Sequence, residues 1–135
     1  MTFPDKPILE IIFLKEQDRY KLTVNEKEFE IIGKDEMLDT VLVGTDVKGR
    51  VFSLETDNKS IIYIASSTGA FVNELLLYDS LSVDNGGLPE NPSDIELKQF
   101  VKDFKKKIRK LDRKAFYRRR TFWSLVCEEM EYGII

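Results

Sequence analysis

The sequence has no histidine among its 135 residues and one cysteine, Cys127. Without imidazole groups, it lacks the usual general base, the activator of serine and cysteine nucleophiles, and the commonest zinc ligand. One cysteine cannot form a disulfide within the chain, which is typical of proteins in the reducing cytoplasm, and we interpret it as a buried, inert thiol. These absences argue against an enzyme, and we expect no catalytic residue, no metal and no cofactor.

Long hydrophobic runs are absent too, since no apolar stretch approaches the ~20 residues of a transmembrane helix. The N-terminal segment MTFPDKPILEII has no basic region followed by an apolar one, so we expect no signal peptide. A hydrophobic share of 42% and a charged share of 33% are those of a globular protein that can bury a core. We therefore expect residues 1–135 to form a single cytoplasmic domain without a membrane partner.

The net charge of −3 conceals two halves of opposite sign. Residues 1–90 contain 9 Lys and Arg against 17 Asp and Glu, whereas residues 91–135 contain 12 against 7. An acidic front half and a basic back half favour a charged macromolecular partner, or each other. Self-association into a homo-oligomer therefore stays open.

Branched and aromatic residues predict strands in the first half of the chain. The expected strands cover residues 7–14, 19–24, 29–32, 40–43, 51–54 and 61–65. Short polar turns separate them, such as Lys48-Gly49, where glycine permits the positive φ of a tight hairpin. This order indicates an antiparallel meander, in which the uninterrupted apolar run at 61–65 predicts a central strand. The polar residues 33–39 predict a loop.

Helical signals follow the strands. Asn73 is a good N-cap for an apolar helical pattern over residues 74–81, and the residues 84–92 predict a loop. Ser93 and Glu96 have the spacing of a capping box that opens a second helix. Apolar residues recur along this helix at helical intervals, at Leu97, Phe100, Val101, Phe104, Ile108 and Leu111.

A third helix is expected over residues 122–132, where Gly133 can end it. The expected fold is therefore α+β, with an antiparallel or mixed meander sheet of about six strands packed against C-terminal helices.

Acidic residues gather in the loops between the strands. Asp35, Glu36 and Asp39 share one loop, and Asp46 follows a few residues later. Paired carboxylates can hold Mg²⁺ or act as acid and base. However, no glycine-bearing calcium-loop consensus surrounds them and no histidine completes a transition-metal site, so we favour a solvated acidic loop.

The basic residues of the second half have two interpretations. Lysines and arginines of the second helix, together with Arg118–Arg120, have the charge to neutralise phosphates, and Phe116 and Tyr117 lie between them as potential stacking platforms. Against this, a solvated polar face of an amphipathic helix already explains the lysines and arginines, and Phe122 and Trp123 have the spacing of a core face. The pI of about 5.1 is also acidic, whereas nucleic-acid-binding domains are usually basic. The sequence therefore disfavours nucleic acid as a partner, and the alternative is a nucleic-acid-binding or regulatory scaffold protein that uses the basic C-terminal helices.

The string VGTDVKGRVFSLE, followed by SIIYIA and FVNELLL, resembles the SUKH superfamily (Smi/Knr type), which includes many bacterial immunity proteins. The comparable positions are Gly44, Asp46, Gly49, Leu54, Tyr63, Asn73 and Leu77. The tail FYRRRTFWSLVCEEMEYGI is similar to the end of one SUKH subgroup, through Phe122, Trp123 and Gly133. Glu74 departs from the pattern, because small hydroxyl residues are common there.

This resemblance implies a non-catalytic protein that binds and neutralises a cognate toxin domain, often a nuclease or deaminase, of a polymorphic toxin system. An inhibitor of a nucleic-acid enzyme gains from presenting carboxylates to a basic active site, because complementary fields raise the association rate. We therefore predict that Asp35, Glu36, Asp39 and Asp57 contact the toxin.

Overall fold

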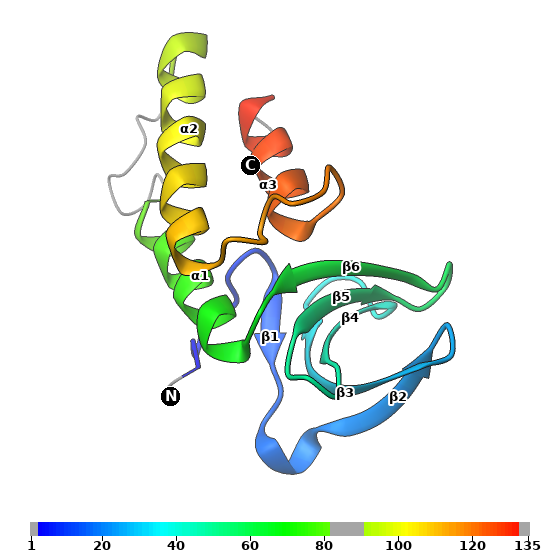
Figure 1. Ribbon diagram of the computed structural model, residues 1–135. Coiled ribbons are helices and arrows are strands. Elements are labelled where there is room, and N and C mark those ends of the chain that lie inside the picture. The colour runs from blue at the N-terminus through cyan, green and yellow to red at the C-terminus, as the bar shows by residue number, and fades with distance from the viewer. Residues whose placement is uncertain (1–2, 82–90, 133–135) are drawn as a thin grey trace.

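The computed structural model describes residues 3–81 and 91–132 of the chain (Figure 1). In these residues a set of strands precedes a set of helices. The strands are β1 (Ile11–Phe13), β2 (Tyr20–Val24), β3 (Lys27–Asp35), β4 (Val41–Thr45), β5 (Val51–Glu55) and β6 (Ser60–Ala65). The helices are α1 (Thr68–Ser80), α2 (Asp94–Leu111) and α3 (Phe122–Glu131), and a short 3₁₀ helix (Glu16–Asp18) joins β1 to β2.

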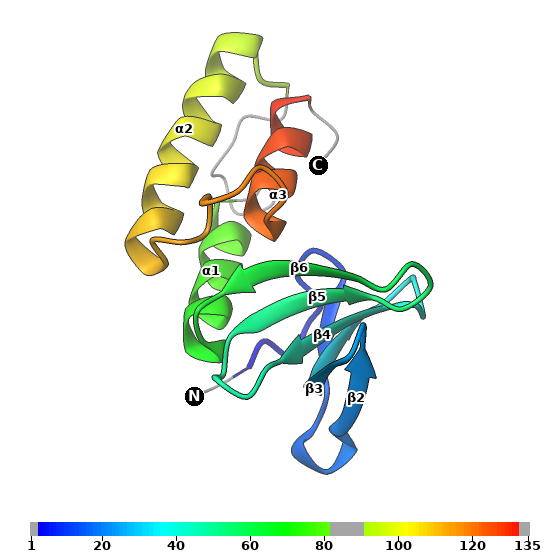
Figure 2. The same cartoon turned by 45° about the vertical axis from the view of Figure 1, so that its right-hand side comes forward.

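The strands form one antiparallel sheet in the order β1-β3-β4-β5-β6, and β2 also pairs with β3. The long strand β3 pairs with β2 along its first half and with β1 at its end. The helices stand together on one side of this curved sheet, as Figures 1 and 2 show. The predicted α+β class and the meander are therefore confirmed.

Alternation along the strands divides the apolar side chains between two cores. Val43 belongs to the large core between the sheet and the helices, whose fully buried centre includes Trp123. Its neighbour Leu42 belongs to a smaller core formed with Phe29 and Leu54. A second hydrophobic core thus stabilises the sheet independently of the helices.

The predicted central position of β6 is wrong, because this strand lies at the edge of the sheet and pairs with β5. Helices α1 and α3 both contact β6, and they bury Ile64 and Ala65 completely. Covering an edge strand with helices allows it to be as apolar as a central one. The hydrophobic run was therefore a sign of helix packing and not of strands on both sides.

The two largest differences from the predicted strand boundaries are at the start of β1 and at the end of β3. Residues 7–14 do not form one strand, because Leu9 and Glu10 have φ values of 51° and 64° and make a turn before β1. Residues 33–35, expected in a loop, continue β3. Gly33 is required there, since a Cβ atom would lie 2.9 Å from the carbonyl oxygen of Ile12 on β1. The glycine marks a close approach of two strands.

The predicted cap of α1 is wrong as well. The helix begins at Thr68, and the hydroxyl of Ser67 accepts a hydrogen bond from the N–H of Ala70 at 3.1 Å. Asn73 lies exposed within the helix. Phe71 and Val72, placed before the helix by the prediction, are buried in its first turns. The sequence signal for the start of this helix was therefore Ser67 and not Asn73.

Other predictions are confirmed. Ser93 and Glu96 form both hydrogen bonds of a capping box, each 3.1 Å long, and α3 covers nearly the expected residues. Gly49 has a φ of 81°. Most of the loop expected over residues 84–92, and Gly133, lie outside the described residues.

Gly44 offers a test of the smaller core. A Cβ atom at this position would lie 2.9 Å from Cδ1 of Leu54 and 3.0 Å from Cβ of Phe29. We expect Gly44→Ala to lower the free energy of unfolding by about 1–3 kcal/mol, because this core must shift to admit a methyl group. Urea denaturation measures the change, and Thr45→Ala on the same strand is the control. An equal effect of both substitutions would contradict the packing described here.

Candidate functional site

The four carboxylates predicted to bind a partner lie at one end of the sheet. Because the strands are antiparallel, the β3–β4 and β5–β6 turns meet at the same end (Figures 1 and 2). The N–H of Thr56 donates a hydrogen bond of 2.9 Å to the carbonyl of Thr40 and joins the two turns. We call this surface the acidic end and define it by Asp35, Glu36, Asp39 and Asp57.

The carboxylates of the acidic end differ in what they do. Oδ1 of Asp35 accepts hydrogen bonds from the N–H groups of Met37 (2.8 Å) and Leu38 (3.0 Å), so this half-buried residue builds the turn. Glu36, Asp39 and Asp57 are exposed. These three residues are therefore the ones available to a partner.

Two apolar side chains, for which the sequence pattern predicted no role, lie exposed between these carboxylates. Met37 is 70% exposed and Leu38 is 56% exposed. Their signal in the sequence was a pair of large apolar residues inside an otherwise polar loop. Apolar side chains surrounded by charge have the anatomy of a protein interface, where the centre is apolar and the rim is polar.

Asp46, considered above as a metal ligand, organises the β4–β5 turn instead. Oδ1 accepts hydrogen bonds from the N–H groups of Lys48 and Arg50, and Oδ2 lies 2.7 Å from a guanidinium nitrogen of Arg50. Partial burial acts to raise the pKa of Asp46, but the hydrogen bonds from Arg50 and Lys48 outweigh it and lower the pKa. In the described part of the chain, no three carboxylate or thiol groups are placed to hold a metal ion.

A buried polar cluster lies between β6 and the helices. Oδ2 of Asp112, a residue 5% exposed at the end of α2, accepts hydrogen bonds from the hydroxyl of Tyr63 (2.7 Å) and the N–H of Ser66 (3.1 Å). Its Oδ1 accepts a third, from the N–H of Lys114 at 3.0 Å. Burial and the bond to Asp112 raise the pKa of Tyr63. Asp112 thereby joins the sheet to the connection between α2 and α3.

Glu74 belongs to the same region and is completely buried. Neither of its carboxylate oxygens has a hydrogen-bond partner among the described residues, and neither does Nε1 of Trp123. Burial raises the pKa of Glu74 to about 9; the nearby indole of Trp123 opposes the shift and the charge of Asp112 adds to it. Glu74 is therefore a neutral acid at pH 7 and is closed to solvent. The sequence indicated it only as a glutamate within the apolar segment FVNELLL.

Cys127 is buried, as expected from the sequence. Burial raises the pKa of its thiol to about 12, which leaves almost none of the reactive thiolate at neutral pH. We expect a maleimide to label the native protein far more slowly than the urea-denatured protein, with mass spectrometry as the measurement. Equal labelling rates would contradict the burial of this side chain.

The core-face interpretation of the last helix is confirmed, because Trp123 is 0% exposed and Val126 is 7% exposed. By contrast, Tyr117 is 51% exposed and Arg118–Arg120 are exposed beside it. The basic segment before α3 therefore forms a surface.

No family model, curated protein or solved structure matches this chain. Within residues 3–81 and 91–132, no helix is both long enough and apolar enough to span a membrane.

Proposed function

We propose that this chain is a cytoplasmic, non-catalytic immunity protein that binds and neutralises the toxin domain of a polymorphic toxin system, a nuclease or deaminase. The observation that carries the proposal is the acidic end, where the meander gathers carboxylates from two turns around the exposed Met37 and Leu38. An active site that binds nucleic acid is basic, so it complements this surface in charge.

The two kinds of side chain at the acidic end contribute differently to binding. Exposed carboxylates such as Glu36, Asp39 and Asp57 steer a basic partner and raise the association rate. Met37 and Leu38 supply apolar surface to bury, and the flexible methionine adapts to the shape of its partner. Burying them slows dissociation.

The residues that carry the SUKH resemblance support this division of roles. Gly44 and Leu54 pack in the smaller core, and Gly49 makes a hairpin turn with positive φ. They are scaffold residues, so the proposal assigns recognition to the charged turns that the scaffold presents.

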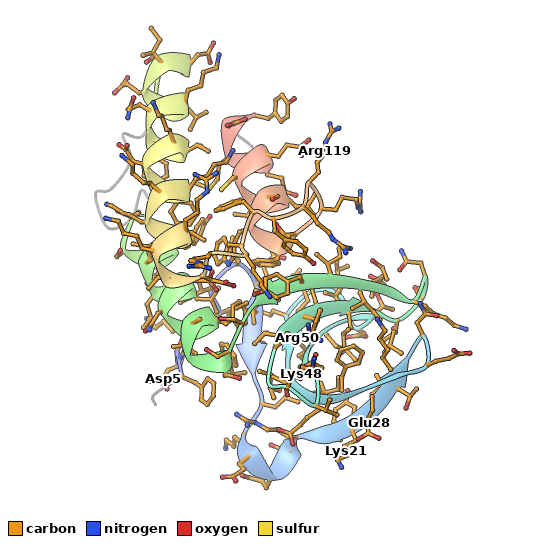
Figure 3. The ribbon with its side chains drawn as sticks, viewed as in Figure 1. Asp5, Lys21, Glu28, Lys48, Arg50 and Arg119 are labelled. Atoms are coloured by element: carbon orange, nitrogen blue, oxygen red, sulfur yellow. The ribbon has the colours of Figure 1, made fainter. Side chains whose placement is uncertain are left out.

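Co-expression with the protein encoded by the neighbouring gene tests the proposal. The wild-type chain should restore growth of cells that express this toxin, whereas the triple variant Glu36→Gln, Asp39→Asn, Asp57→Asn should not. A control triple variant, Asp5→Asn, Glu16→Gln, Asp18→Asn, removes the same charge from exposed positions elsewhere and should still protect; Figure 3 shows Asp5 beside α1. Failure of the wild-type chain to protect would contradict the proposal.

Replacing the apolar pair Met37 and Leu38 should change the dissociation rate of the complex and not its association rate. The double variant Met37→Ser, Leu38→Ser should dissociate from the toxin about tenfold faster or more, because each exposed anchor loses the apolar area it buries. Its association rate should stay close to that of the wild type, since no charge changes. Surface plasmon resonance measures both rates, and an unchanged dissociation rate would exclude these residues from the interface.

The alternative proposal, a nucleic-acid-binding or regulatory scaffold function of the basic helices, makes a different prediction. The chain should retard a nucleic acid in a gel at low salt, and neutralising Arg118–Arg120 should abolish the shift. No retardation at low salt would exclude the nucleic-acid-binding form of this alternative.

A further inference from the structure

A polar pocket of about 530 Å³ opens between α2, the connection that follows it, and α3. Its charged lining residues are Lys105, Arg109, Arg118, Arg119, Glu128 and Glu131. Figure 3 shows Arg119 near α3, away from Lys21 and Glu28 on the sheet. The lining shares no residue with the acidic end, so the pocket is a separate feature of the helices.

Aromatic rings in the pocket hold its cations in place. The guanidinium of Arg109 lies 5.1 Å from the ring centroid of Phe116, and that of Arg118 lies 5.1 Å from the ring centroid of Tyr117. A guanidinium stacked on a ring loses little freedom on binding, and its N–H edge still matches the oxygens of a phosphate or carboxylate. These arginines are organised for an anion before one arrives.

The net charge of the lining indicates the charge of the anion that it would bind. Four cationic side chains and two carboxylates leave a formal charge of +2. The one ion pair found among them in the described residues, Lys105 with Glu131, is 3.9 Å long and partly exposed, so it neutralises these groups only weakly. A phosphate monoester with two negative charges balances this net charge, whereas a long polyanion carries more negative charge than the lining offsets.

The remaining lining groups suit the rest of a nucleotide. Tyr132 is 75% exposed and offers a ring to a base, whereas the ring of Tyr117 already holds the guanidinium of Arg118. Glu128 presents a carboxylate that can accept hydrogen bonds from a sugar hydroxyl or an exocyclic amine. A volume of about 530 Å³ falls within the range of small-molecule sites, about 300–1,000 Å³.

We propose that this pocket binds a nucleoside monophosphate, with the phosphate against the arginines and the base against an exposed tyrosine. The ligand is either a free nucleotide or the 5′-phosphorylated end of a single strand, because both present the same dianion and base. This site goes beyond the proposed immunity function, which uses the opposite charge on a different surface.

Isothermal titration calorimetry of the full chain tests this proposal with adenosine monophosphate, inorganic phosphate and adenosine as probes. We expect the nucleotide to bind more tightly than either part alone. The variant Arg118→Gln, Arg119→Gln should weaken nucleotide binding about tenfold or more, since it removes charge-assisted hydrogen bonds. The matched control Lys98→Gln, Lys102→Gln, at exposed α2 positions outside the pocket, should bind as the wild type does.

Short oligonucleotides with and without a 5′-phosphate separate the two sources. If the phosphorylated strand binds as tightly as the mononucleotide, the ligand is a strand end. If the phosphorylated strand binds more weakly, the ligand is the free nucleotide. Equal binding of both oligonucleotides would overturn the proposal, because recognition would then rest on the backbone and not on the dianion. It would also be overturned if the mononucleotide bound no better than inorganic phosphate, or if the arginine variant, folded by circular dichroism, bound like the wild type.

Discussion

Raising the pH from about 5 to about 8 should destabilise the wild-type protein relative to the variant Glu74→Gln by an amount of the order of 4 kcal/mol. In the folded state the pKa of Glu74 is about 9, against an ordinary value of 4.5. Between these two values the unfolded chain releases the proton and the folded chain retains it. The free energy of unfolding therefore falls with rising pH, by about 1.4 kcal/mol per pH unit from this group.

Glutamine isolates this contribution because it has the shape of the neutral acid and does not titrate. Near pH 5 the two proteins should have similar stabilities, since Glu74 is then protonated when folded and mostly so when unfolded. Urea denaturation across the pH range measures the divergence, and Glu36→Gln at an exposed position is the control. If the stabilities of wild type and Glu74→Gln changed in parallel with pH, Glu74 would not be the buried neutral acid described here.

Replacing Asp112 with alanine should lower the free energy of unfolding by about 3 kcal/mol or more, because hydrogen bonds to a charged group are each worth about 1.5–3 kcal/mol. Three donors lose their acceptor: the hydroxyl of Tyr63 and the N–H groups of Ser66 and Lys114. Because Glu74 is neutral near pH 6, removing the carboxylate of Asp112 relieves no charge repulsion that would offset this loss.

The variant Tyr63→Phe is the matched comparison, since it removes one of these bonds and retains the carboxylate. It should lower the free energy of unfolding by about 1.5–3 kcal/mol, less than Asp112→Ala does, in urea denaturation near pH 6. An Asp112→Ala protein as stable as the wild type would show that the carboxylate does not join the sheet to the helical connection.

Local signals in the sequence were enough to predict much of the fold. Ser93 with Glu96 marked the start of α2, and Gly49 marked a hairpin, because caps and turns depend on adjacent residues. Features that depend on distant packing were not predictable in this way. The strand β6 is apolar at the edge of the sheet because helices cover it. Glycine is needed at position 33 because β1 approaches closely there.

The same distinction applies to the candidate site. The sequence placed acidic residues in two turns, but their meeting depends on the antiparallel meander that brings residues 35–39 and Asp57 to one end. The turn-forming role of Asp35 and the exposure of Met37 and Leu38 required the structure. The burial of Glu74 was not predictable, because its apolar neighbours predicted a helix without indicating that its own side chain faces the core.

The most direct test of the central claim is the affinity of the purified chain for the toxin domain encoded by the neighbouring gene. The wild type and the control triple variant at Asp5, Glu16 and Asp18 should bind tightly, with an association rate that falls as salt is added. The triple variant at Glu36, Asp39 and Asp57 should associate at least about tenfold more slowly and lose most of this salt dependence. Equal association rates and equal salt dependence for all three proteins would contradict the assignment of binding to the acidic end.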